Sequence, residues 1–348
     1  MSVARVQSVE VGPGRLAEPS ARGPRPWIQT AREFLAVRDE PLTYAIGELV
    51  PAGCLSLWHG EPRVRKTWAG LELTIAKATG TPAFGLPRFA VDAAGPAAYF
   101  SQEDAAPRVR DRLRRLLAGR RIEDAPELLH VSVHAGIDLE REDWQETLAR
   151  DVRRLGLRLL VLDPIRRFAA SADKGPSEVS AVTAVLRRLA SQAGVAVVIL
   201  HHDVKPTRDG RDDRRRSHRA SGGDWFAAAD APIALEAAGA ATVAYPEDFK
   251  HGLDPRPFRF RIVEAGDGLL LAGDDIQAGT ESKDIDLQER ILNLLAERPR
   301  ISTRKVEAGM KGVSNGAVRD ALDALMGEGK VDRTEGPKRS WLWWVGAS

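Results

Sequence analysis

The sequence has 348 residues, of which 43% are hydrophobic, and a formal net charge of +2. That length makes two domains the default expectation, and the small net charge neither favours nor excludes a nucleic-acid partner. The one cysteine, Cys54, excludes an intramolecular disulfide framework. The longest apolar runs, such as LRLLVLD and VAVVIL, are far shorter than the ~20 residues needed to cross a bilayer, and no secretion signal is recognisable. We therefore expect a cytoplasmic protein with no membrane segment.

Residues 1–38 are rich in Gly, Pro, Arg and Ala, with only a short helical pattern at 27–37, which indicates a loose N-terminal arm. Residues 39–281 alternate apolar β-type runs with helical patterns. The helices are expected at 66–79, 105–118, 143–155 and 177–193, and the β-type runs read CLSLWHG, AAYFSQED, LLHVSV, LRLLVLDP and VAVVILHH. Apolar strands separated by helices form parallel sheets covered on both faces, so we expect an α/β fold with a mostly parallel sheet flanked by helices. Binding residues then belong at the carboxyl ends of the strands.

The later part of the chain predicts a hairpin and then a separate small domain. Further β-type runs at 231–237 and 241–245 precede a hairpin that turns at Gly266-Asp267-Gly268. A polar stretch places a boundary near Ser282. In residues 282–348 we expect three helices and two β-type runs, which together describe a winged helix: 287–297, a short helix from Ser302, 314–326, and strands on either side of Glu335-Gly336-Pro337.

The stretch HGEPRVRKTW, residues 59–68, follows a β-type run and opens a helix, as a phosphate-binding loop does. Such a loop presents backbone N–H groups to the anion, a lysine to the terminal phosphates and a hydroxyl to magnesium. Arginine stands where glycine is usual, and a non-glycine residue held at positive φ costs about 1–2 kcal/mol. A basic strand-to-helix turn is the plainer alternative. The nucleotide-binding candidates are Gly60, Glu61, Pro62, Arg63, Val64, Arg65, Lys66, Thr67 and Trp68.

Carboxylates end two of the expected strands. Glu103 is the candidate to orient and deprotonate an attacking water, and Asp104 is interpreted as a helix cap. Asp163 follows the most apolar strand, where a carboxylate supports Mg²⁺ together with the Thr67 hydroxyl; a turn or cap residue is its alternative.

Two histidines, His201 and His202, end the strand VAVVILHH. Adjacent residues of a strand point to opposite faces, so one can face a phosphate while the other faces the next layer.

The polar segment 205–219 follows directly after these histidines. A charge run of this kind is most often simply solvated, but its position favours contact with a polyanion such as DNA. Its candidate DNA-binding residues are Lys205, Arg208, Arg211, Arg214, Arg215 and Arg216.

Taken in order, five segments make residues 40–275 resemble the RecA-like ATPases of the RepA-like hexameric replicative helicase group. These segments are LVPAGCLSLWHG, YFSQED, LLVLDP, VILHH and RASGGDWFAAAD. The resemblance implies that Lys66 and Thr67 bind ATP phosphates and Mg²⁺, that Glu103 activates water and that Asp163 supports the metal. It further implies a γ-phosphate sensor at His201 or His202. The following loop would contact single-stranded DNA, and Arg219 would reach a neighbouring subunit's nucleotide.

The departure from that family is the loop itself, where both inner glycines are arginine. Arg63, Arg65 and Lys66 would concentrate three cations that repel one another until a triphosphate binds, which predicts a salt-sensitive nucleotide affinity.

In the winged helix, the third helix and the hairpin are expected to contact DNA through Arg319, Lys338 and Arg339; packing against another protein is the alternative. WLWW at 341–344 is interpreted as a strand covering the core.

The sequence as a whole predicts an ATP- and Mg²⁺-dependent DNA motor of plasmid, phage or mobile-element replication. It would act on single- or double-stranded DNA as a homo-oligomer such as a hexamer. A nucleotide-sensing DNA-binding regulator with a slow or inactive core is the alternative.

Overall fold

The computed structural model describes residues 28–37, 41–172, 175–203, 224–252, 254–276, 282–310, 313–336 and 340–346. By its contacts the chain divides into two compact units, Met1–Pro41 and Leu42–Ser348. The described part of the first unit contains one short helix, α1 (Ala31–Leu35). Thr30 begins it with a capping box: its side chain accepts the Glu33 backbone N–H, and Glu33 in turn accepts the Thr30 backbone N–H.

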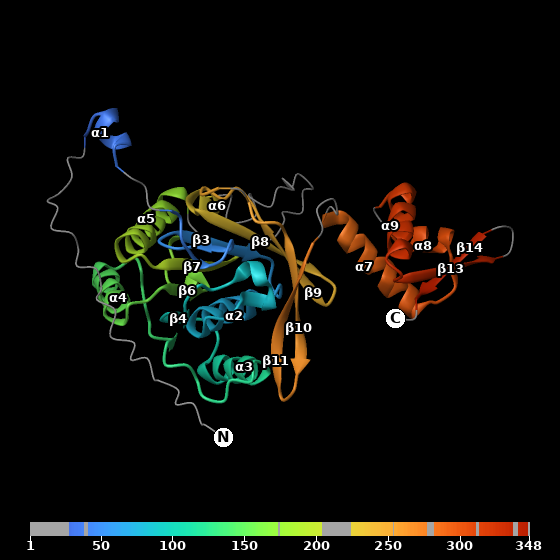
Figure 1. Ribbon diagram of the computed structural model, residues 1–348, viewed down its shortest axis with the longest axis horizontal. Helices are drawn as coiled ribbons and strands as arrows, with labels where there is room; N and C mark the ends of the chain where they lie inside the picture. The colour runs from blue at the N-terminus through green and yellow to red at the C-terminus, as the bar shows by residue number, and fades with distance from the viewer. Residues whose placement is uncertain are drawn as a thin grey trace, which may run out of the picture. The chain divides into compact units, whose positions relative to one another are not determined.

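The second unit is built on a nine-stranded sheet in the order β11-β10-β9-β8-β3-β7-β6-β4-β5 (Figure 1). The six strands from β8 to β5 run parallel, and β9, β10 and β11 extend the sheet as an antiparallel ribbon. The strand bounds are β3 Leu55–Gly60, β4 Ala97–Ser101, β5 Leu129–Val133, β6 Leu159–Asp163, β7 Ala196–His202, β8 Ala231–Ala238, β9 Ala241–Pro246, β10 Phe258–Ala265 and β11 Gly268–Asp275. A separate pair, β1 (Tyr44–Ile46) and β2 (Val50–Pro51), precedes them.

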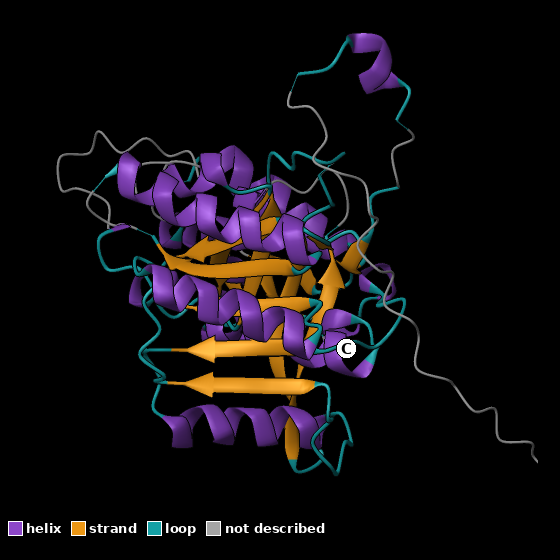
Figure 2. Ribbon diagram, turned by 90° about the vertical axis from the view of Figure 1, so that its left-hand side faces the viewer, coloured by secondary structure: helices purple, strands orange, loops and turns teal. Residues whose placement is uncertain are grey.

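Helices cover both faces of the sheet (Figure 2). Alternate residues of the central strands enter two different cores, because successive side chains of a strand point to opposite faces. Residues such as Trp58 and Val198 pack with α2 and α3, whereas Leu57 and Val197 pack with α4, α5 and α6. The helix bounds are α2 Lys66–Thr79, α3 Ala106–Gly119, α4 Glu142–Leu155, α5 Pro176–Ala193 and α6 Asp224–Ala228, with short 3₁₀ turns at Ala83–Gly85, Pro87–Phe89 and Ile165–Arg167. The expected α/β fold is confirmed.

The C-terminal elements form a small antiparallel sheet with three helices. The order along the chain is α7 (Ser282–Glu297), β12 (Ile301–Ser302), α8 (Thr303–Gly309), α9 (Asn315–Gly327), β13 (Val331–Gly336) and β14 (Ser340–Val345), with the strands arranged β12-β14-β13. Their apolar core includes Ile291, Val306, Leu322 and the buried Trp343. Helices α8 and α9 and the β13–β14 pair lie within one or two residues of the predicted positions, α7 begins five residues before its predicted start, and β12 is an addition.

No helix within the described ranges is both long and apolar enough to cross a membrane.

Candidate functional site

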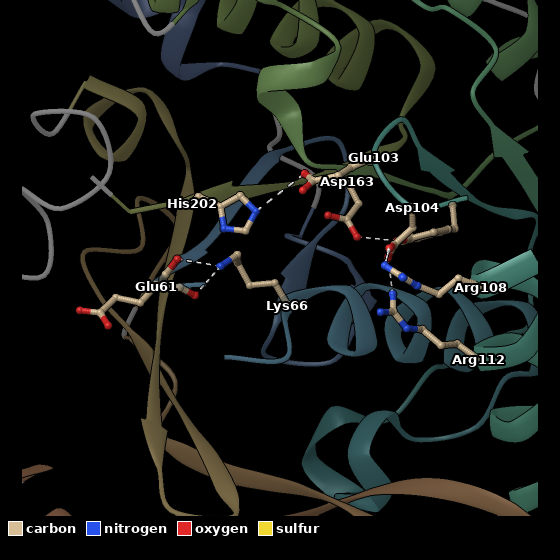
Figure 3. Close-up of polar contacts among 10 residues, drawn as sticks. Glu61, Lys66, Glu103, Asp104, Arg108, Arg112, Asp163 and His202 are labelled. Atoms are coloured by element: carbon tan, nitrogen blue, oxygen red, sulfur yellow. Dashed lines mark hydrogen bonds and ion pairs between the residues drawn. The ribbon is translucent and has the colours of Figure 1, made fainter. Parts of the chain in front are cut away.

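The predicted phosphate loop, carboxylates and second histidine meet at the carboxyl edge of the parallel strands (Figure 3). The register brings them together: Gly60 at the end of β3 lies opposite His202 of β7, and Asp163 of β6 lies opposite Ser101 of β4. Lys66 opens α2 directly above this edge. Residues scattered over 140 positions of sequence therefore share one site because parallel strands end together.

The loop adopts the backbone of a phosphate cradle although arginines replace its two inner glycines. Arg63 and Arg65 have φ values of 74° and 64°, in the left-handed region, and Arg65 immediately precedes the first turn of α2. Each such residue costs about 1–2 kcal/mol relative to glycine. Gly60 is required for a different reason: a Cβ there would lie 2.4 Å from the Leu235 carbonyl oxygen. The strain expected at the two arginines is thus present, and the loop keeps its form despite it.

The side chain of Arg65 is bound to β9. Its guanidinium donates to the Ala241 carbonyl at 3.0 Å and to the Thr242 hydroxyl at 3.1 Å. Arg63 is exposed and has no hydrogen bond or ion pair with another described residue. The Arg65 guanidinium is therefore held by the neighbouring strand, and the salt-sensitive nucleotide affinity stays a prediction.

Lys66 is folded back onto the loop. Its ammonium donates to the Gly60 carbonyl at 2.7 Å and the Glu61 carbonyl at 2.8 Å, and the residue is only 5% exposed. Burial lowers the pKa of Lys66 to about 8, against the opposing effect of nearby carboxylates led by Asp203. The lysine therefore lies where phosphate oxygens could replace the two carbonyls as acceptors.

Asp163 is almost fully buried and is held by two hydroxyls. Tyr99 donates to it at 2.5 Å, and the Thr67 side chain also hydrogen-bonds to it. Burial raises the pKa of Asp163, while both hydrogen bonds oppose that shift. A carboxylate, a threonine hydroxyl and a lysine beside a helix N-terminus form the donor set that a magnesium–triphosphate complex requires, so the residues fit both groups. Sequence analysis missed Tyr99, which reads as a core residue.

Glu103 projects from the end of β4, with half of its side chain exposed, and its carboxylate lies 4.0 Å from the His202 Nε2. In the close-up, His202 lies near both Lys66 and Glu103 (Figure 3). Burial, reinforced by the Lys66 charge, lowers the pKa of His202 to about 4. His202 is therefore a neutral imidazole near pH 7, and Glu103 has access to water.

The two adjacent histidines face opposite sides of the sheet, as expected from strand geometry. His201 is 2% exposed and packs in the other layer, with its ring 5.6 Å from that of Trp225. His202 is thus the histidine that faces the phosphate loop.

Two neighbouring side chains have roles other than those expected from the sequence. Asp104 does not cap α3: Ala105 is the N-cap residue and makes no side-chain cap, whereas Asp104 binds Arg108 at 3.0 Å and also Arg112. The interpretation of Asp104 as a cap is wrong because helix α3 starts one residue too late for it. Trp68, included among the nucleotide-binding candidates, lies with its ring under the Arg112 guanidinium at 5.5 Å.

A buried pair that the sequence did not predict lies beneath the loop. The Nδ1 of His59 is 2.8 Å from the Asp203 carboxylate, and the Asp203 backbone N–H donates to the Gly60 carbonyl at 3.0 Å. The pair joins the ends of β3 and β7, the two strands that carry the loop and His202.

Several DNA-contact candidates lie outside the described residues, and Arg319 is engaged within its own domain. These DNA-contact candidates are Lys205, Arg208, Arg211, Arg214, Arg215, Arg216, Lys338 and Arg339. Arg219, which is expected to reach a neighbouring subunit's nucleotide, also lies outside the described residues. Arg319 on α9 binds Glu307 of α8 at 2.8 Å. Among the described residues there is no group of three or more His, Cys, Asp or Glu placed to hold a metal by themselves.

No curated protein matches the chain in sequence. The family model of the AAA domain matches residues 18–208, more than half of the chain and the part that carries the phosphate loop, Glu103, Asp163 and both histidines. The chain therefore belongs to the AAA domain family, with a nucleotide-binding ATPase-type domain.

Proposed function

We propose that this protein binds ATP with Mg²⁺ and hydrolyses it. The observation that carries the proposal is the meeting of Lys66, Thr67, Asp163 and Glu103 at one edge of the sheet. Together they supply three functions: Lys66 is a phosphate-binding cation, Thr67 and Asp163 are suited to magnesium, and Glu103 is an accessible base. A Mg²⁺ ion held by Thr67 and Asp163, together with the Lys66 ammonium, would neutralise part of the phosphate charge, and the metal would polarise the terminal phosphoryl group.

The chain's own groups have separable roles in this proposal. Lys66 exchanges its two carbonyl acceptors for phosphate oxygens, and the N-terminus of α2 faces the same anion. Thr67 and Asp163 orient toward the metal. Glu103 accepts the proton of the attacking water, and the neutral His202 between Glu103 and Lys66 reports the state of the terminal phosphate to β7.

The finer proposal is a RepA-like helicase or motor that acts on DNA as a homo-oligomer such as a hexamer. Residues 39–281 would form the ATPase domain and 282–348 a winged-helix domain. The support is the order of motifs and the arrangement of three helices with a three-stranded sheet in the C-terminal part. Asp203 lies at the start of the basic segment, so contact of that segment with single-stranded DNA would reach the site through β7.

One observation favours a second candidate, a nucleotide-sensing DNA-binding regulator with little turnover. The loop stores strain at Arg63 and Arg65, and in this conformation its lysine is hydrogen-bonded to the loop itself. Such a site could bind nucleotide without sustained hydrolysis.

Steady-state ATP hydrolysis with Mg²⁺, with and without single-stranded DNA, tests these alternatives. We expect Glu103→Gln to lower kcat at least about 100-fold while ATP still binds, as loss of a general base does. Lys66→Ala should abolish binding as well as turnover. Glu127→Gln, a carboxylate exposed elsewhere on the surface, is the matched control and should match the unmodified protein.

Turnover that DNA stimulates and that both site variants abolish would support the motor. ATP binding without turnover, unaffected by Glu103→Gln, would favour the regulator. Absence of ATP binding to the unmodified protein would refute both.

A further inference from the structure

We propose that Arg65 is a positioning residue for ATP binding, which acts by holding the phosphate loop against β9 and not as a phosphate ligand. This inference rests on the proposed function and adds a determinant of nucleotide affinity to it. In this structure the Arg65 guanidinium has two acceptors on β9, the Ala241 carbonyl and the Thr242 hydroxyl.

The loop is seated on β8 and β9 at three successive points. Gly60 packs closely against the Leu235 carbonyl of β8. Val64 is buried, and its carbonyl accepts the Thr242 hydroxyl at 3.2 Å. Arg65 then returns two hydrogen bonds to the same strand. Thr242 itself is fully buried and is paired on both sides within the sheet, with Ala237 of β8 and Phe260 of β10.

Thr242 can serve both partners at once. A hydroxyl has one hydrogen to donate and two lone pairs to accept with. It donates to the Val64 carbonyl and accepts from the Arg65 guanidinium, so the two bonds close a ring between the loop and β9. Strand β9 is in turn fixed on its other side, where Thr242 lies opposite Phe260 in β10.

Arg63 provides the contrast within the same loop. Its φ is also in the left-handed region and its charge is the same, yet it has no hydrogen bond or ion pair with another described residue. The backbone conformation alone therefore does not require a tether. What distinguishes Arg65 is its position at the start of α2, where a change of φ would redirect the loop away from the helix N-terminus.

Loss of the tether should weaken ATP binding without changing the chemistry. If only a fraction of the molecules holds the loop in its binding form, apparent affinity falls by that fraction, whereas bound complexes react as before. We expect Arg65→Ala to raise the KM for ATP about tenfold, equivalent to about 1.4 kcal/mol, and to change kcat less than about twofold.

The test is a double-mutant cycle of Arg65→Ala with Thr242→Val, followed in KM, in kcat and in urea unfolding. Thr242→Val removes the hydroxyl and leaves every charge in place. If Arg65 acts by holding the loop, each single variant should raise the KM for ATP, and the KM of the double variant should not exceed that of Arg65→Ala. Arg65→Lys should resemble Arg65→Ala, because an ammonium cannot reproduce the fork of the guanidinium. Arg110→Ala, which removes an exposed arginine of α3, is the charge-matched control for activity.

A phosphate ligand would behave differently. Thr242→Val would then leave KM unchanged, Arg65→Lys would retain most of the affinity, and Arg65→Ala would reduce the dependence of ATP affinity on salt. Any of these results in a protein that hydrolyses ATP would overturn the inference and leave the proposed function standing. In unfolding experiments, Arg65 and Thr242 should couple with each other, whereas Arg63 and Thr242 should not. Failure of the unmodified protein to bind ATP would remove the proposed function and this inference together.

Discussion

Removing Arg120 should destabilise the second unit strongly, because the buried carboxylate of Glu72, on the helix that carries Lys66, then loses its ion-pair partner. Glu72 of α2 is 1% exposed and accepts the Arg120 guanidinium together with the Phe84 backbone N–H at 2.6 Å. Among the described residues, its second oxygen has no hydrogen-bond partner. Arg120→Ala leaves the carboxylate with a single donor, and breaking a buried ion pair from one side costs about 3–5 kcal/mol.

The loss of folding stability in Arg120→Ala should increase as the pH rises. Burial raises the pKa of Glu72 above its ordinary value of 4.5, and the Arg120 charge is the largest opposing effect. Without Arg120 that pKa rises further. A carboxyl whose pKa is higher in the folded than in the unfolded state binds more protons when folded, so its contribution to stability falls as pH rises above 4.5. The deficit of Arg120→Ala should therefore be greater at pH 8 than at pH 5.

Urea unfolding at pH 5, 6.5 and 8 measures both effects. Arg114→Ala removes an exposed arginine of α3, the helix that ends just before Arg120; it is the control and should change stability by less than about 0.5 kcal/mol. Replacing both partners by leucine should recover most of the loss, because an apolar pair does not leave a charge unpaired. A deficit for Arg120→Ala below about 1 kcal/mol, or one equal at all three pH values, would show that the carboxylate finds water or another partner.

Three further predictions concern single side chains. Tyr99→Phe removes a hydrogen bond to the buried Asp163 and should destabilise the fold by about 1.5–3 kcal/mol while raising the Mg²⁺ concentration needed for half-maximal activity; a magnesium titration identical to that of the unmodified protein would contradict it. Arg65→Gly should be about 1 kcal/mol more stable than Arg65→Ala in urea unfolding, because glycine tolerates a φ of 64°, and equal stability would refute this account of the strain. Burial raises the pKa of Cys54 to about 11, so about 0.1% of it is thiolate at pH 8 and disulfide reagents should modify it at least about 100-fold more slowly than a free thiol until urea is added; rapid modification in the native state would argue against its burial.

The sequence predicted the parallel core well because its signals there are local. Helix α2 has the bounds expected from the pattern, since it begins at the end of the loop and Gly80 ends it in the left-handed conformation. Shorter elements were missed because two- and three-residue strands, such as β2 (Val50–Pro51) and β12 (Ile301–Ser302), lack a period that can be recognised. Helix α7 begins at Ser282, five residues before the predicted start, because polar residues lengthen it beyond its apolar pattern.

The residues of the candidate site were likewise only partly predictable from the sequence. Lys66, Asp163 and Glu103 could be predicted because each occupies the end of a strand or the start of a helix, and parallel strands bring those ends together. Tyr99 could not, because one tyrosine in an apolar strand gives no sign that its hydroxyl meets a carboxylate. The His59–Asp203 pair joins residues 144 positions apart and depends on the order of β3 and β7 in the sheet.

The arginines in this loop show that the glycine pattern of a phosphate-binding motif is only an indirect indication of its backbone conformation. What a phosphate cradle requires is a backbone conformation, and glycine is common because it adopts positive φ at little cost. Here Arg63 and Arg65 adopt that conformation, and at Arg65 the hydrogen bonds to a strand 177 residues away offset the strain. The loop thus departs from the glycine pattern but keeps the backbone conformation, and at Arg65 the contact with β9 supports that conformation. The Arg65–Thr242 cycle measures how much that contact contributes to the loop.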